Sequence, residues 1–205
     1  THARVVFPTE VRDNVAILIE GDTITAIDPA SSAGATEIDL RGRTLMPGLI
    51  DLHCDAMEKE VEPRPGVHFP LEFACAQADK RNAAAGITTV FHALSFANHE
   101  LGVRNNAFAA EIARSIGDWQ AHALIDNRVH VRYEVTDETA PPVLSALLQD
   151  GHAHLMSFMD HSPGQGQFRD VEAYRAYLAK TYKTDEAQID DILARKAGAA
   201  QGAMR

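Results

Sequence analysis

The residues best suited to chemistry lie in the segment 47–55, which reads Pro-Gly-Leu-Ile-Asp-Leu-His-Cys-Asp. It is a turn and a short apolar run that ends in two side chains able to bind a metal, His53 and Asp55. If residues 49–53 form a strand, side chains alternate across it, so this imidazole and this carboxylate point the same way. Together they could share one divalent metal ion. An isolated His-x-Asp also fits a strand whose histidine only hydrogen-bonds a loop.

A further carboxylate, Glu134, lies near the end of a strand predicted at 129–135. There it could bridge two metal ions, or it could pair with Arg132 or Arg128, because structural ion pairs use the same positions. His92, in a strand predicted at 87–94, is expected to pack beneath the site.

A dense polar segment follows the strand predicted at 154–159 and contains Asp160, His161, Ser162 and Gln165. Acid, imidazole, hydroxyl and amide together suit a site better than a core. We therefore predict Asp160 and His161 as catalytic residues, and Ser162 and Gln165 as substrate-binding residues. The alternative is a turn in which Asp160 caps the backbone and Pro-Gly reverses the chain.

Two cations, Lys59 and Arg64, follow the His-x-Asp pair in what we predict to be one loop. Prolines flank Arg64 and restrict the loop, so less entropy is lost when the guanidinium is held in place. A held guanidinium suits bidentate contact with phosphate oxygens. The alternative is a solvated cation, and the neighbouring Glu58, Glu60 and Glu62 are expected to be solvated.

Parallel strands are needed to bring these residues together. Apolar periodicity predicts alternating strands and helices after Pro47-Gly48. The predicted strands are 49–53, 87–94, 129–135 and 154–159, and the predicted helices are 71–85, 105–122, 141–148, 171–182 and 185–200. Such units in series predict a parallel sheet with crossover helices and a site at the carboxyl ends of the strands. A full (β/α) barrel needs eight units and about 250 residues, so we expect a longer native protein or an open four-stranded domain.

The residues before this boundary read as a small β unit. Its predicted strands are 15–20, 23–27, 36–40 and 44–46. We therefore divide the chain into residues 1–46 and residues 47–205.

Composition narrows the class of protein. The chain has 205 residues, of which 45% are hydrophobic and 23% charged, as in ordinary globular proteins. A formal net charge of −10 argues against nonspecific nucleic-acid or anionic-membrane binding. No apolar run approaches the roughly 18 residues that span a bilayer. The two cysteines make no disulfide framework, so a reducing cytoplasm is the expected location.

The order of parts resembles the amidohydrolase superfamily. The resemblance lies in the segment 47–53 and in Ala85-Gly-Ile-Thr-Thr-Val90, after a small β unit. Most members carry His-x-His on the first barrel strand, whereas this chain has His-Cys-Asp at 53–55. With Pro-Arg-Pro at 63–65, Arg-Tyr-Glu at 132–134 and Met-Asp-His-Ser-Pro-Gly-Gln at 159–165, the chain resembles the PhnM family from about residue 45 to 190.

This resemblance implies a metal-dependent-hydrolase (β/α)8 TIM-type barrel, with strands 1–4 present here, and a small N-terminal β-sandwich. It implies an enzyme of the carbon–phosphorus lyase pathway that hydrolyses α-D-ribose 1-methylphosphonate 5-triphosphate to the 5-phosphate and pyrophosphate. The implied cofactor is one or two divalent ions of zinc, manganese, iron or magnesium. The implied metal ligands are His53, Asp55, Glu134 and His161, and Lys59 and Arg64 would neutralise the triphosphate.

Two rival functions stay open. One is an amidohydrolase that cleaves a cyclic amide or deacetylates a sugar. The other is a noncatalytic homologue that kept the fold and lost its site. The expected partner is a small phosphorylated ribose phosphonate rather than nucleic acid or membrane, and homo-oligomerisation is left open.

Overall fold

A computed structural model describes residues 1–64, 66–98, 105–162, 164, 169–182 and 185–203. The chain divides into two compact units, Thr1–Gly48 and Leu49–Arg205. None of the described helices is long and apolar enough to cross a membrane.

The first unit is made of short strands in two sheets. In one sheet the order is β2 (Val11–Val15), β1 (Ala3–Val6) and β5 (Thr44–Leu45), with β1 antiparallel to β2 and parallel to β5. The other is a hairpin of β3 (Ile17–Glu20) and β4 (Thr23–Ile27). A small core is formed by Ala3, Val5 and Val15. The β-sandwich arrangement of this unit stays a prediction.

Of the strands predicted in this unit, one is shorter than expected and one is absent. The single strand expected at 15–20 is interrupted at Ala16, whose amide donates to Asp28 Oδ1 at 2.8 Å and whose carbonyl accepts from the Asp28 amide at 2.8 Å. The strand expected at 36–40 is not present, because the described backbone hydrogen bonds of this segment are isolated ones, from the Thr1 amino group to Ile38 O, from Leu40 N to Thr1 O and from Arg43 N to Leu40 O. The sequence analysis missed β1 and most of β2.

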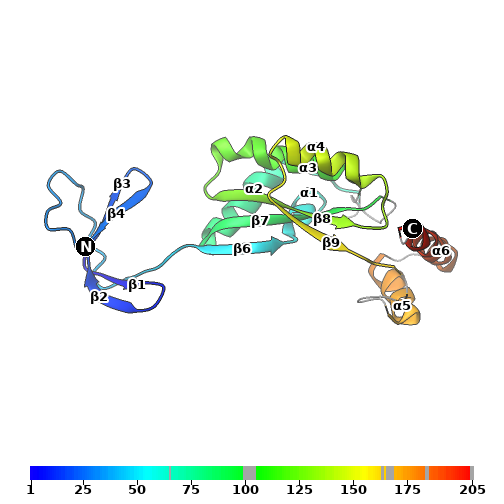
Figure 1. Ribbon diagram of the computed structural model, residues 1–205, viewed down its shortest axis with the longest axis horizontal. Helices are drawn as coiled ribbons and strands as arrows, with labels where there is room; N and C mark the ends of the chain where they lie inside the picture. The colour runs from blue at the N-terminus through cyan, green and yellow to red at the C-terminus, as the bar shows by residue number, and fades with distance from the viewer. Residues whose placement is uncertain (65, 99–104, 163, 165–168, 183–184, 204–205) are drawn as a thin grey trace. The chain divides into compact units, whose positions relative to one another are not determined.

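The second unit is built on a four-stranded parallel sheet. Its order along the sheet is the order along the chain, namely β6 (Leu49–Cys54), β7 (Ile87–Phe96), β8 (Asp126–Glu134) and β9 (Leu155–Met159). The helices packed against it are α1 (Ala56–Val61), α2 (Leu71–Ala84), α3 (Asn106–Trp119) and α4 (Ala140–Gln149). Figure 1 shows the described helices between β6 and β9 on one face of the sheet. Doubly wound folds cover both faces, so sequential order with one covered face is the winding of half a barrel. The predicted α/β class with parallel strands is confirmed.

The alternation of β8 explains how this sheet separates a core from a site. Val129 and Val131 face the helices and are at most 1% exposed. Because successive side chains of a strand point to opposite faces, His130, Arg132 and Glu134 lie on the other face of the sheet. Helix α3 completes the core with apolar residues at helical spacing, of which Ile112 and Ile116 are both 2% exposed.

A short helix stands where the sequence analysis predicted a loop. Helix α1 begins directly after Asp55 and buries Met57 and Val61, four residues apart, completely in the core. The glutamates expected to be solvated are also bound. Glu58 accepts from the Ser95 amide, Glu60 pairs with Arg81, and Glu62 accepts from the Gly66 amide.

A buried polar network ties α2 to the beginning of β8. The Asp79 carboxylate accepts hydrogen bonds from Leu124 N at 2.8 Å, Ile125 N at 3.3 Å and Asn127 Nδ2 at 2.8 Å. Asn127 Oδ1 in turn lies 2.9 Å from Nε2 of His92, which is 1% exposed. The predicted packing of His92 is thereby confirmed.

The chain ends in two further helices, α5 (Val171–Tyr182) and α6 (Glu186–Ala203). They share a small apolar cluster of their own, formed by Tyr174, Leu178, Ile189 and Ile192.

Candidate active site

The predicted site residues lie at the carboxyl ends of the parallel strands. His53 is the last residue but one of β6, and Glu134 is the last residue of β8. Asp55 follows β6, while Asp160 and His161 follow β9. In parallel sheets the carboxyl ends of the strands meet at one edge, which is where barrel enzymes place catalytic groups.

The first cluster joins β6 to β8. His53 Nε2 lies 3.3 Å from Asp55 Oδ1, so the two side chains meet as predicted. The reason differs from simple alternation, because Asp55 has left the strand and precedes α1 with φ −83° and ψ 6°. Arg132 NH1 donates to the same Asp55 Oδ1 at 3.0 Å. Of the alternatives left open for Glu134, the pairing with Arg132 is therefore not the one observed.

The second cluster joins β8 to the segment after β9. Glu134 is 3% exposed, and its Oε2 lies 2.8 Å from Nδ1 of His161. Its Oε1 accepts from the His161 amide at 3.2 Å and from the Thr136 hydroxyl at 3.0 Å. Burial alone would raise the pKa of Glu134, but the bonds and charge of His161, together with Thr136, outweigh it and leave this pKa lowered. Glu134 is therefore a buried, ionised carboxylate at neutral pH.

The segment after β9 forms the capping interaction considered from sequence, while the catalytic roles of its residues stay predictions. Asp160 Oδ1 accepts from the Ser162 amide at 3.0 Å, which is the capping turn. Hydrogen bonds from Ser162 hold the pKa of Asp160 below its ordinary value. Asp160 is exposed and Ser162 is 2% exposed. Gln165, predicted to bind substrate, lies outside the described residues.

The predicted phosphate-binding cations lie on different elements. Lys59 is an exposed residue of α1, so its predicted place in a loop is wrong. Arg64 is exposed and lies in a tight turn, where its carbonyl accepts from the Val67 amide at 2.9 Å. The Glu62 carboxylate closes this turn through the Gly66 amide at 2.7 Å.

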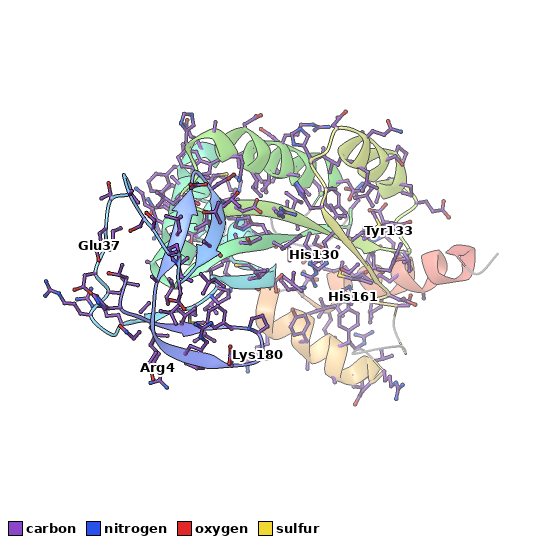
Figure 2. All side chains as sticks on the ribbon, turned by 60° about the vertical axis from the view of Figure 1, so that its left-hand side comes forward. Arg4, Glu37, His130, Tyr133, His161 and Lys180 are labelled. Atoms are coloured by element: carbon purple, nitrogen blue, oxygen red, sulfur yellow. The ribbon has the colours of Figure 1, made fainter. Side chains whose placement is uncertain are left out.

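Two residues of the site were missed from the sequence, His130 and Asp51. His130 lies beside the end of β6 in Figure 2, with Nδ1 3.1 Å from Leu52 O and Nε2 2.9 Å from Ser157 Oγ. Burial lowers its pKa, although the Leu52 carbonyl acts in the opposite direction. The signal was available, because His130, Arg132 and Glu134 occupy alternate positions and must share a face.

A polar network fastens the two segments that follow β7 and β8. Asp137 accepts from the Asn98 amide at 2.6 Å, from Asn106 Nδ2 at 2.9 Å and from the Thr139 amide at 2.9 Å. Asn98 also donates to the Thr139 hydroxyl at 2.6 Å. The ends of both connections are therefore held together next to the site.

The donor set fits a divalent metal in kind, since imidazole and carboxylate are the ligands that such ions accept. Glu134 Oε2 is buried and, besides its ion-pair neighbour His161, has no hydrogen-bond partner among the described residues. In the same part of the chain, no three His, Cys, Asp or Glu side chains are grouped so that they could hold an ion together. The arrangement is thus two imidazole–carboxylate pairs, each able to supply part of a coordination shell.

Comparisons with known proteins identify two relatives. The chain is 33% identical over 173 residues to an alpha-D-ribose 1-methylphosphonate 5-triphosphate diphosphatase of Escherichia coli (strain K12), covering 83% of this chain and 46% of that protein. It is 35% identical over 94 residues to a dihydroorotase of Wolbachia sp. subsp. Drosophila simulans (strain wRi), covering 44% of this chain and 20% of that protein. Each match spans less than half of the relative's own length. No protein-family model matches the chain.

Proposed function

We propose, on the premise that this chain is related to the PhnM family of the amidohydrolase superfamily, that it carries part of the active site of a phosphonate-pathway diphosphatase. The proposed reaction hydrolyses α-D-ribose 1-methylphosphonate 5-triphosphate to the 5-phosphate and pyrophosphate. One observation carries the proposal. Two imidazole–carboxylate pairs lie at the carboxyl ends of parallel strands, and the chain that carries them is 33% identical to a diphosphatase named for this substrate. Because the relatives are hydrolases, the coarser statement that the chain is of hydrolase type stands independently of the substrate.

In this proposal His53 and Asp55 hold one divalent ion, and Glu134 and His161 share or hold a second. Zinc, manganese, iron and magnesium all accept such ligands. When bound, a divalent ion supplies a Lewis acid and lowers the pKa of a water molecule that can attack phosphorus.

The chain's own residues prepare this site. The lowered pKa of Glu134 keeps its carboxylate ionised and ready to accept, and the His161 amide and Thr136 hydroxyl fix one of its oxygens. Arg132 holds Asp55 from the side of β8, which leaves Asp55 Oδ2 outside that bond. These contacts orient both carboxylates before any ligand binds.

Substrate phosphates are assigned to the cations near the strand ends. Arg64, in its Glu62-closed turn, and Lys59 on α1 would neutralise triphosphate oxygens. Ser162 and Gln165 remain the proposed hydrogen-bonding residues, with Asp160 and His161 as the proposed proton-handling pair.

The surrounding architecture is proposed to be the eight-stranded barrel of the superfamily, with residues 1–46 as a small β-sandwich and residues 47–205 as the first barrel half. The four parallel strands in chain order support this. A cytoplasmic protein that binds neither nucleic acid nor membrane remains a prediction from composition.

A second candidate is hydrolysis of a cyclic amide, which the 35% identity to a dihydroorotase over 94 residues favours. Phosphorus-31 NMR of the protein with the ribose triphosphate, in parallel with a cyclic-amide hydrolysis assay, separates the two. Pyrophosphate release that is lost in His53→Ala and kept in His122→Ala, an exposed histidine of the 3-10 turn that follows α3, is the expected result. Amide hydrolysis without pyrophosphate release would transfer the assignment to the second candidate. A protein without stoichiometric divalent metal or either activity would be the noncatalytic homologue.

A further inference from the structure

The strand that carries His53 contains an irregularity at that residue. Asp51 pairs with Val90 and Cys54 pairs with His92, so β6 advances three residues while β7 advances two. One extra residue on a strand is a β-bulge, which bends the strand and re-aims side chains. Leu52 and His53 make up the bulge, and the direction of the His53 imidazole depends on how the bulge is held.

Two side chains engage the backbone of this bulge. Asp51 Oδ1 accepts from the His53 amide at 2.9 Å. On the other side, His130 Nδ1 lies 3.1 Å from the Leu52 carbonyl. A carbonyl oxygen only accepts, so Nδ1 of His130 carries the proton and donates. His130 Nε2 lies 2.9 Å from the Ser157 hydroxyl on β9.

The ring of His130 reaches across a neighbouring strand to make these contacts. His130 lies on β8, and its register partner on β7 is Ala93, whose side chain is only a methyl group. A small residue there leaves room for the imidazole to pass over β7 to β6. The His130 and His53 rings then meet edge to face, with centroids 5.1 Å apart and an interplanar angle of 84°. His130 is 5% exposed, so it is packed beneath the surface that a substrate would contact.

We infer that His130 is a positioning residue that holds the 51–54 bulge from β8 and β9 and so fixes the direction of the His53 imidazole. Asp51 is its counterpart within β6. His130 acts through His53 and touches neither substrate nor metal. This inference rests on the proposed function only in giving His53 a role as a metal ligand.

The matched control is another buried histidine of the same sheet. His92 lies on β7, is 1% exposed and has a hydrogen bond of 2.9 Å to Asn127, but it faces the helices. His130→Leu and His92→Leu each remove one buried, hydrogen-bonded imidazole. Only the first should release the bulge, whereas both should lower global stability.

The first readout is amide hydrogen exchange in the full chain, with each variant corrected for its own global stability. We expect His130→Leu to speed exchange at residues 52–54 at least about 10-fold relative to His92→Leu. His130→Asn, whose side-chain amide can donate to the Leu52 carbonyl, should restore most of the protection. If His130→Leu does not fold, His130→Asn and Ser157→Ala provide the comparison, with faster exchange at 52–54 expected in Ser157→Ala. Equal exchange at 52–54 in the His130 or Ser157 variants and in His92→Leu would overturn the inference.

The second readout is the affinity for Mn²⁺ measured by calorimetry. Residues that orient metal ligands typically cost about 10- to 100-fold in metal affinity when changed, so that loss is expected in His130→Leu and not in His92→Leu. If the unaltered protein binds no Mn²⁺ or other divalent ion, the proposed function fails, and the exchange data alone still decide the role of His130. Metal affinity that is unchanged in His130→Leu would overturn its positioning role.

Discussion

The carboxylate of Asp79 provides a stringent test of how helix α2 is fastened to the beginning of β8. It is 1% exposed on α2 and accepts three hydrogen bonds, from the Leu124 and Ile125 amides and from Asn127. Asp79→Ala removes both acceptor oxygens, and with them all three hydrogen bonds, and leaves buried donors without a partner. Asp79→Asn keeps one acceptor oxygen but turns an amide N–H toward a donor.

The expected losses follow from these contacts. A hydrogen bond to a charged group contributes about 1.5–3 kcal/mol, and a buried donor left unsatisfied costs a similar amount. The bonds from Leu124 N and Asn127 Nδ2, both 2.8 Å, count fully, and the 3.3 Å bond from Ile125 N counts for less. We therefore expect Asp79→Ala to lower the free energy of unfolding by about 4 kcal/mol and Asp79→Asn by about 2 kcal/mol. Domains of this size unfold at about 5–15 kcal/mol, so the larger loss is severe.

Urea unfolding followed by tryptophan fluorescence measures this directly. The chain has one tryptophan, Trp119 at the end of α3, so the signal reports on the unit that contains Asp79. A lower midpoint with an unchanged slope identifies a loss of stability. Asp118→Ala, at an exposed position of α3, is the matched control and should change stability by less than about 0.5 kcal/mol. A loss below about 1 kcal/mol in Asp79→Ala would refute this account of the network.

Three further predictions concern titratable groups. Burial lowers the pKa of His92 more than its bond to Asn127 raises it, so the unfolded chain binds more protons. The His92 contribution is then fully present above about pH 6.5 and falls on acidification, and His92→Gln should flatten the stability curve between about pH 7 and 5. The pKa of Glu134 is lowered despite burial, so this group stabilises the fold above about pH 4.3 and loses that contribution as pH falls through its folded pKa. Glu134→Gln should therefore make the free energy of unfolding, measured by circular dichroism, fall less steeply in acid. Burial raises the pKa of Cys75 to about 11 and also raises that of the half-buried Cys54. Iodoacetamide at pH 7.5 should therefore label both thiols slowly, and Cys54 before Cys75. Equal labelling rates by mass spectrometry would contradict this.

Local sequence patterns predicted the repeating units well because each unit is long enough to show its period. The helix predicted at 71–85 is observed as Leu71–Ala84, and the strand predicted at 87–94 as Ile87–Phe96. Helix α1 was missed because six residues are too few for a helical period to appear. Its stability comes from Met57 and Val61, whose burial depends on segments distant in sequence.

The pairing of site residues depended even more on tertiary structure. Arg132 was one of several partners considered for Glu134, two residues away, but it binds Asp55, which is 77 positions away in the chain. Glu134 is matched instead by His161, and that pair forms because β8 and β9 are neighbours. The meeting of His53 with Asp55 was predicted, yet the bulge and the turn into α1 that produce it have no local sequence signal. The spacing of residues in the sequence identified the side chains of the site, but which of them contact each other depends on the arrangement of the strands in the sheet.

The hydrogen bonds that join Asn98, Asn106, Asp137 and Thr139 have a consequence for how the site can diversify. In a barrel, new specificities arise by changing one strand-to-helix loop while the others keep their shape. Here the segments after β7 and β8 are both hydrogen-bonded to the carboxylate of Asp137. A substitution at Asp137 therefore alters the effect that any substitution near Asn98 has on the structure. Variation in these two loops should therefore be epistatic, with tolerated changes occurring in pairs. Directed evolution that randomises both loops together has access to solutions that single-loop libraries exclude.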